Sequence, residues 1–271
     1  MSVSVAGVDS PDDPFAKMMA ERCGFALRVL RPSLADLIAA MPAVIRVLGG
    51  FDPMELRNRA VVWLALEAAR EEGITAVLTG DAADELLAGY SYIINMPSDQ
   101  VCPYLDFLNG VMRFSSIPMG ASLGIQAQLP YLDPGVRDFA LTMTRDHLIV
   151  LRDGQHFGKK VLRDAFADLL PQEISWRVKT PIEYGSGSRA LQKFVIDSVS
   201  DEEFEVARVQ VLGEDGVSLR DKEQLFYYRI YRTILASPHQ QPGGAERCTA
   251  CGGAVDRAEQ KYCRVCGAYP C

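Results

Sequence analysis

A short apolar strand that runs directly into an acidic loop most constrains how this chain can fold. Residues 74–78 have the composition of a buried strand. The loop after it combines small residues with three carboxylates: Thr79, Gly80, Asp81, Asp84 and Glu85. Open α/β sheets bind nucleotides at the carboxyl ends of their strands, where small residues admit a ligand and carboxylates can hold Mg²⁺. A plain polar turn, with acidic residues at a helix start, is the alternative.

The neighbouring segments predict alternating strands and helices. Strands are expected over residues 2–8 and 26–30, and helices over 15–22, from Ser33 onward and over 52–72. Asp52 before Pro53 is a strong helix start, and Pro42 predicts a break or kink in the preceding helix. This order is typical of a parallel sheet with crossover helices. Four more helices are expected in the mostly helical second half: 133–143, 159–169, 189–199 and 221–235.

Length and charge exclude several classes of protein. A chain of 271 residues allows one large domain, or one domain with a small module. The net charge of −7 argues against binding to nucleic acid. No apolar run reaches the roughly 18–20 residues of a membrane span, and the N-terminal residues lack the pattern of a signal peptide. A cytoplasmic location is the default expectation.

Paired cysteines near the C-terminus predict a metal site. Cys248 and Cys251 form one CxxC pair, and Cys263 and Cys266 form a second. Two such pairs can supply four thiolates to a tetrahedral ion, so a structural Zn²⁺ is expected, with rubredoxin-like iron as the alternative. A zinc ribbon is therefore predicted over residues 247–271, after a linker over 237–246 that lacks any apolar period. Cys271 is expected to be a spare thiol.

Several ordered motifs resemble the synthetase domain of glutamine-dependent asparagine synthetases. The segment LTGDAADELLAGY at 78–90 is similar to the family's SGEGSDEVFGGY, and GIQAQLPYLD at 124–133 to GvEaRvPfLD. KKVLR at 159–163 and WRVK at 176–179 resemble the motifs K.iLR and WR.K. The resemblance extends over roughly residues 1–235. A domain over residues 1–236 is accordingly expected to have the ATP-pyrophosphatase α/β fold, which is adenine-nucleotide α-hydrolase-like.

The resemblance implies an ATP- and Mg²⁺-dependent ligase that adenylates a small-molecule carboxylate and then aminates it, as in asparagine biosynthesis. Thr79 matches a serine near adenine, Gly80 lets the nucleotide lie flat, and Asp84 matches the aspartate that holds Mg²⁺ and pyrophosphate. Asp81 matches a glutamate close to the acceptor, and Lys179 matches a lysine that meets the ATP phosphates. Two assignments have equally simple structural alternatives: Val5 as an adenine contact or strand core, and Lys159 as a phosphate cation or helix-surface residue.

Two departures from the family pattern bear on function. Gln126 and Gln128 replace the Glu and Arg of GvEaR, and an amide can neither act as a general base nor form a guanidinium fork. The family's pyrophosphate-binding SGGxDSS loop, with its first strand, does not occur in this sequence. Without that first strand, one position in the family's sheet has no strand to fill it. One of three arrangements is therefore expected: direct pairing of the flanking strands, a companion polypeptide carrying SGGxDSS or glutaminase activity, or an upstream segment. The rival interpretation is a non-catalytic subunit that uses its ribbon to bind a partner.

Overall fold

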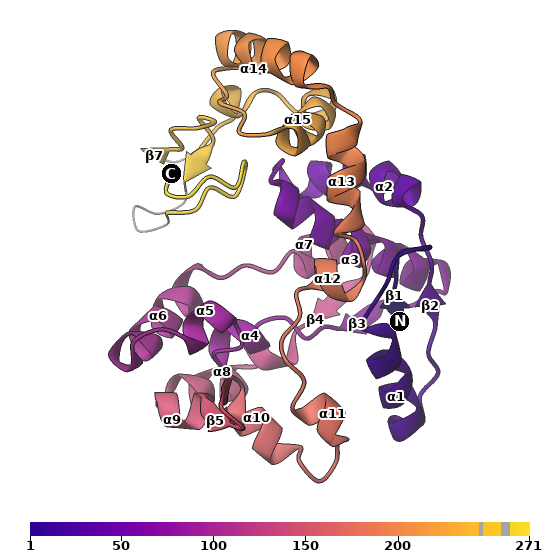
Figure 1. Ribbon diagram of the computed structural model, residues 1–271, viewed down its shortest axis with the longest axis vertical. Helices are drawn as coiled ribbons and strands as arrows, with labels where there is room; N and C mark the ends of the chain where they lie inside the picture. The colour runs from indigo at the N-terminus through magenta and orange to yellow at the C-terminus, as the bar shows by residue number, and fades with distance from the viewer. Residues whose placement is uncertain (244–245, 256–260) are drawn as a thin grey trace. The chain divides into compact units, whose positions relative to one another are not determined.

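The computed structural model describes residues 1–243, 246–255 and 261–271, which form two compact units (Figure 1). The first unit comprises Met1–Lys17, Phe25–Gly73 and Ile182–Cys271, and the second comprises Met18–Gly24 and Ile74–Pro181. Part of the predicted linker (244–245) and of the predicted ribbon (256–260) lies outside the described residues. The predicted domain boundary at residue 236 stays a prediction.

Two long helices begin as the sequence predicts and form the centre of the first unit. Helix α2 (Leu34–Leu48) starts at Ser33, whose side chain forms a capping box with Asp36. Helix α3 (Pro53–Glu71) is capped by the Asp52 side chain. Helix α2 continues through Pro42, so a break there is wrong, whereas a kink stays a prediction. Its buried face includes Leu37, Met41, Val44 and Ile45. Burial of each such side chain contributes about 1.5–3 kcal/mol, so the four together exceed the proline penalty of about 3 kcal/mol.

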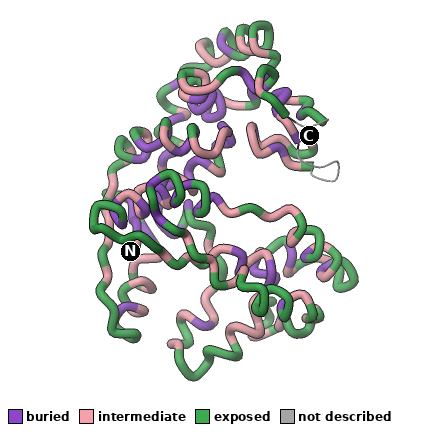
Figure 2. Tube along the Cα trace, turned by 180° about the vertical axis from the view of Figure 1, so that it is seen from behind, coloured by how far each residue is buried: buried purple, intermediate pink, exposed green. Residues whose placement is uncertain are grey.

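The rest of the first unit is mainly helical. Its later helices are α12 (Ile182–Gly185), α13 (Ala190–Asp197), α14 (Asp201–Asp215) and α15 (Lys222–Ile234). Helix α15 packs on α2, and buried residues concentrate along α2, α3 and α15 (Figure 2). The Phe51 ring meets Tyr228 and Tyr231 edge to face, with centroids 4.9 and 5.1 Å away. Helix α14 has a start signal, Ser200 with Glu203, but was not predicted.

A buried ion pair crosses the same core. The Arg57 guanidinium donates from Nε to Glu183 at 2.8 Å and from Nη1 to Glu223. Both side chains are buried: 8% of the Arg57 side chain and 3% of the Glu223 side chain are exposed. Gln192 donates to the second oxygen of Glu223 at 3.2 Å. The three charges therefore depend on one another rather than on water.

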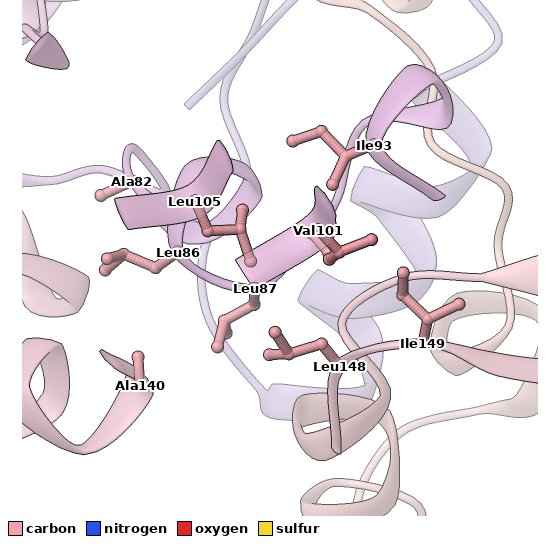
Figure 3. Packing of buried hydrophobic residues seen from close by; sticks show 10 residues of the cluster. Ala82, Leu86, Leu87, Ile93, Val101, Leu105, Ala140, Leu148 and Ile149 are labelled. Carbon is pink, nitrogen blue, oxygen red and sulfur yellow. The ribbon is translucent and has the colours of Figure 1, made fainter. Parts of the chain in front are cut away.

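The second unit is built from short elements around an apolar cluster. Helices α4 (Ala83–Leu86), α6 (Ser98–Val111), α8 (Pro134–Leu141) and α9 (Arg145–Leu148) contribute to it. Figure 3 shows Leu86, Leu87, Leu105 and Leu148 pointing into this cluster. Smaller elements complete the unit: α5 (Ser91–Ile94), α7 (Ser116–Ser122), α10 (Lys160–Ala165), α11 (Gln172–Ser175) and the hairpin β5 (Val150–Arg152) with β6 (Gln155–Phe157).

The strands form pairs rather than one continuous sheet. In the first unit, β1 (Ser2–Val3) pairs in parallel with β2 (Val29–Leu30). In the second, β3 (Ala76–Leu78) pairs in parallel with β4 (Gln126–Gln128). Both pairs run parallel, but each sheet among the described residues has two strands, so a single parallel sheet stays a prediction. One edge of β3 therefore has no partner strand among the described residues, and its Leu78 is 73% exposed.

Among the described residues, no single helix has the length and apolar composition of a membrane span. Helices α2 and α3 meet that test only as a pair joined across a 106° bend. Both are core helices, as their buried faces show.

Candidate functional site

The loop after β3 holds its small and acidic residues in an open arrangement. Asp81 accepts hydrogen bonds from the Thr79 hydroxyl at 3.1 Å and from the Ser116 hydroxyl at 2.5 Å. Gly80 is exposed, and nothing lies within 4 Å of the position that a β-carbon would take there. The loop therefore leaves room beside its backbone at the strand end, where α/β folds place ligands.

Three predicted residues meet beyond this loop. Asp84, in the first turn of α4, has Oδ1 2.9 Å from Lys159 Nζ and Oδ2 3.1 Å from Lys179 Nζ. The Asp84 side chain is only 14% exposed, and the lysines are 24% and 31% exposed. One carboxylate between two ammonium groups leaves one net positive charge. The net positive charge favours binding of a polyanion such as a phosphate chain. The carboxylate suits Mg²⁺, which commonly binds one or two carboxylates together with substrate phosphates.

An unusual backbone brings these residues together. Ala82, Ala88 and Lys159 all have positive φ, at 75°, 54° and 58°. Lys159 donates its backbone N–H to Leu87 O at 2.8 Å, which holds the start of α10 against the end of α4. Left-handed conformations in residues other than glycine cost about 1–2 kcal/mol each and cluster at functional sites.

Two glycines make this contact possible. A β-carbon on Gly158 would lie 1.8 Å from Ala88 O, which is a backbone atom. A β-carbon on Gly89 would lie 1.8 Å from Asp84 Oδ1 and 2.5 Å from Lys159 Cε. A side chain at Gly89 would displace the Asp84–Lys159 pair, and one at Gly158 would displace the backbone at Ala88.

Arg163 connects the two lysine-bearing segments. Its guanidinium donates to the carbonyls of Gly158 at 2.7 Å, Ser175 at 2.5 Å and Arg177 at 3.2 Å. It also lies 5.6 Å from the Trp176 ring centroid. Burial lowers the pKa of Arg163, and the Asp84 charge opposes that shift. We did not predict this role, although the K.iLR motif places Arg163 one helical turn after Lys159.

Tyr90 and a small pocket lie next to Lys179. The Tyr90 hydroxyl donates to Glu85 at 2.6 Å, and Lys179 Nζ is 5.9 Å from the Tyr90 ring centroid. Burial, followed by the Glu85 charge, raises the pKa of Tyr90, so the phenol stays protonated. The pocket has a volume of ≈ 160 Å³, and its lining includes Gly89, Gly158, Arg163 and Lys179. That volume, below the ~300–1,000 Å³ of typical ligand pockets, suits phosphate groups better than a whole nucleotide.

The remaining predicted positions lie elsewhere. Val5 belongs to the first unit, where it is 1% exposed and donates its N–H to Ser186 O at 2.8 Å. This buried environment agrees with the alternative interpretation, in which Val5 is part of the strand core. Contact between Val5 and adenine stays a prediction. Gln126 and Gln128 are exposed on β4. The roles assigned to Thr79, Gly80, Asp81, Asp84, Lys159 and Lys179 likewise stay predictions.

The four predicted metal ligands form a compact buried cluster. The Sγ atoms of Cys248, Cys251, Cys263 and Cys266 all lie within 4.8 Å of one another. Cys248 Sγ is 3.8 Å from Cys266 Sγ, and Cys251 Sγ is 3.7 Å from Cys263 Sγ. A tetrahedral zinc ion with Zn–S bonds of about 2.3 Å requires S···S separations of about 3.8 Å. The cluster therefore fits a tetrahedral zinc ion.

Comparison with known proteins identifies the family. The profile of asparagine synthase matches residues 1–106 and 118–251, which is most of the chain. The chain belongs to the asparagine synthase family. The match includes both strand pairs, the Asp84 cluster and the first CxxC pair, whereas the second CxxC pair lies outside it.

Individual members of the asparagine synthase family show the same relationship. The chain is 25% identical to a probable glutamine-hydrolysing asparagine synthetase of Dictyostelium discoideum over 83% of its own length and 43% of the relative. It is 24% identical to asparagine synthetase B of Escherichia coli K12, over 93% of its length and 46% of the relative. The chain thus spans less than half the length of these relatives.

Proposed function

We propose that this asparagine synthase family member takes part in ATP-dependent amide formation. The observation that carries the proposal is the meeting of Asp84, Lys159 and Lys179 beside an open strand end, in a chain whose family match covers all three positions. Two cations and one buried carboxylate are suited to holding a metal-bound pyrophosphate group while it departs.

The proposed chemistry has two steps. A carboxylate oxygen of the substrate attacks the α-phosphorus of ATP, the bond to pyrophosphate breaks, and an acyl-adenylate forms. Ammonia or an amine then attacks the acyl carbon and loses a proton, and AMP leaves. Asp84 would hold Mg²⁺ together with phosphate oxygens, and Lys159 and Lys179 would neutralise the charge on pyrophosphate. Thr79 and Gly80 would border the adenosine.

The proposal includes a further polypeptide segment. Phosphate loops present backbone N–H groups to the ligand, and the described part of the site supplies only side-chain cations. The open edge of β3 is where a strand leading into such a loop could pair. We propose that a segment carrying SGGxDSS, encoded upstream or supplied by a companion, completes the site. A glutaminase companion would supply ammonia.

Carboxylate-dependent exchange between ATP and pyrophosphate tests this view. We expect little or no exchange from the 271 residues alone, because side-chain cations without backbone donors bind phosphate weakly. The assay follows incorporation of labelled pyrophosphate into ATP, with aspartate as the first carboxylate tried. Robust exchange from this chain alone would contradict the need for a further segment.

We also propose a structural Zn²⁺ bound by Cys248, Cys251, Cys263 and Cys266. The sulfur separations of 3.7 and 3.8 Å support it. Purified protein is expected to contain about one zinc per chain by elemental analysis, and Cys251→Ser to lose most of it. Cys102→Ser, outside the cluster, is the control and should keep full loading. Iron in place of zinc, or zinc retained by Cys251→Ser, would contradict the assignment.

A non-catalytic subunit is the second candidate. Gln126 and Gln128 favour it, because both stand where the family motif carries charged residues and neither amide can replace them in proton transfer or ion pairing. Such a subunit would retain the fold and use the cysteine pairs to bind a partner. Exchange that stays absent after the site is completed would favour this candidate.

A further inference from the structure

Within the first unit, the segments that carry the cysteine pairs are bound to the helical core through their backbone carbonyls. Between the first two ligands, Ala250 O accepts the Ser218 N–H at 2.7 Å. Between the second two, Val265 O accepts the Phe51 N–H at 2.6 Å. Cys266 O accepts the Gln224 side-chain amide at 2.7 Å. Both cysteine pairs are therefore held by the unit, at the position where the thiolates would hold a metal.

The same contacts reach the start of α3. Asp52 is 3% exposed, caps α3 by accepting from Glu55 N, and also accepts from Arg220 Nη2 at 3.2 Å and from the Tyr262 hydroxyl. Tyr262 directly precedes the ligand Cys263. One carboxylate thus joins a core helix to the segment that carries the second pair of ligands.

The fit is too close for a loosely tethered module. A β-carbon on Gly50 would lie 2.7 Å from Arg264 O and 3.1 Å from Val265 O, both backbone atoms. Next to it, Phe51 is fully buried against Tyr228 and Tyr231. The turn between α2 and α3 is therefore packed directly against the second cysteine pair.

We propose that metal occupancy of the four-cysteine site controls the stability of the first unit. Without the ion, no metal–sulfur bonds connect the two cysteine-bearing turns. The turns therefore shift, and the carbonyls that accept from Phe51, Ser218 and Gln224 move away from their donors. Phe51 and Gln224 are buried, whereas Ser218 is exposed before α15. Leaving the two buried donors unpaired weakens the unit. This inference rests on the zinc proposal.

The experiment removes zinc from the full chain with a chelator and follows thermal unfolding together with hydrogen exchange at the Phe51 amide. We expect Tm to fall by about 5–10 °C and Phe51 exchange to accelerate at least tenfold, because the buried hydrogen bonds of Phe51 and Gln224 are lost. Adding Zn²⁺ back should reverse both changes. A protein that binds about one zinc but melts unchanged after chelation overturns this inference alone. A protein that never binds zinc overturns the zinc proposal as well.

A pair of glycine variants separates docking from metal binding. Gly50→Ala places a methyl group against Arg264 O while leaving every ligand in place, so it should still bind zinc but show a much smaller change in Tm on chelation. Gly213→Ala, within α14, is the control because its β-carbon would meet nothing within 4 Å. Alanine should raise its Tm slightly, but the change in Tm on chelation should equal that of the parent protein. Equal responses from the two variants would contradict the proposed coupling.

Discussion

Replacing Arg57 with methionine is expected to lower the free energy of unfolding by about 3–5 kcal/mol at neutral pH. The Arg57 side chain is 8% exposed and donates to both Glu183 and Glu223. Methionine fills a similar volume but leaves two buried carboxylates without their shared cation. Chemical denaturation measures the loss. Arg208→Met is the matched control, because the Arg208–Glu205 pair is about half exposed and such pairs contribute at most about 1 kcal/mol.

The loss in Arg57→Met should depend on pH. Burial raises the pKa of Glu223, and the Arg57 hydrogen bond and charge oppose that rise. A carboxyl whose pKa is higher in the folded state favours folding below its unfolded pKa, and this contribution is lost as pH rises through the folded value. Removing Arg57 moves the folded pKa of Glu223 higher still. The deficit against the parent protein should therefore shrink as pH falls toward the ordinary carboxyl range, and a pH-independent deficit would contradict this account.

Completing the phosphate site is expected to raise MgATP affinity by at least tenfold. A segment with strand, SGGxDSS loop and helix would pair with the open edge of β3 and direct backbone N–H groups at the same pyrophosphate as Asp84 and Lys179. The test adds the coding region immediately upstream, or co-expresses the neighbouring open reading frame. Binding of MgATP is then measured by calorimetry, and Tm by thermal unfolding.

Two variants show whether the gain uses the proposed site. Asp84→Asn keeps the shape but removes the charge that would hold Mg²⁺, so it should abolish most of the gain. Asp164→Asn is the control, because Asp164 pairs with Lys160 at 2.7 Å on the surface of α10. If neither added segment raises Tm or affinity, the completion proposal is wrong and the non-catalytic subunit becomes the better interpretation.

Local signals predicted the helix starts well. The Ser33–Asp36 capping box and the Asp52–Pro53 start depend on residues within one turn, so the sequence alone contains the interaction. The strands were predicted too long, because residues 2–8 and 26–30 have strand composition but β1 and β2 pair over two residues each. Strand length depends on which partner is available, and composition does not contain that information.

The sequence predicted which residues form the site but not how they are arranged. Asp84, Lys159 and Lys179 follow from the motifs. Their ion pairs depend on the positive φ of Lys159 and on the three backbone carbonyls that Arg163 binds. Docking of the cysteine pairs was missed for a similar reason. It uses backbone carbonyls such as Val265 O, which every residue possesses and no motif can mark.

The open edge of β3 also affects how the protein behaves in concentrated solution. The strand reads Ala76, Val77 and Leu78, so it carries neither the charges nor the proline that usually protect an edge. Leu78 is 73% exposed, and a second molecule could pair with the edge of β3 that has no partner strand among the described residues. Self-association through β3 would then compete with the proposed companion for the same edge, and dilute solution would favour the completed site.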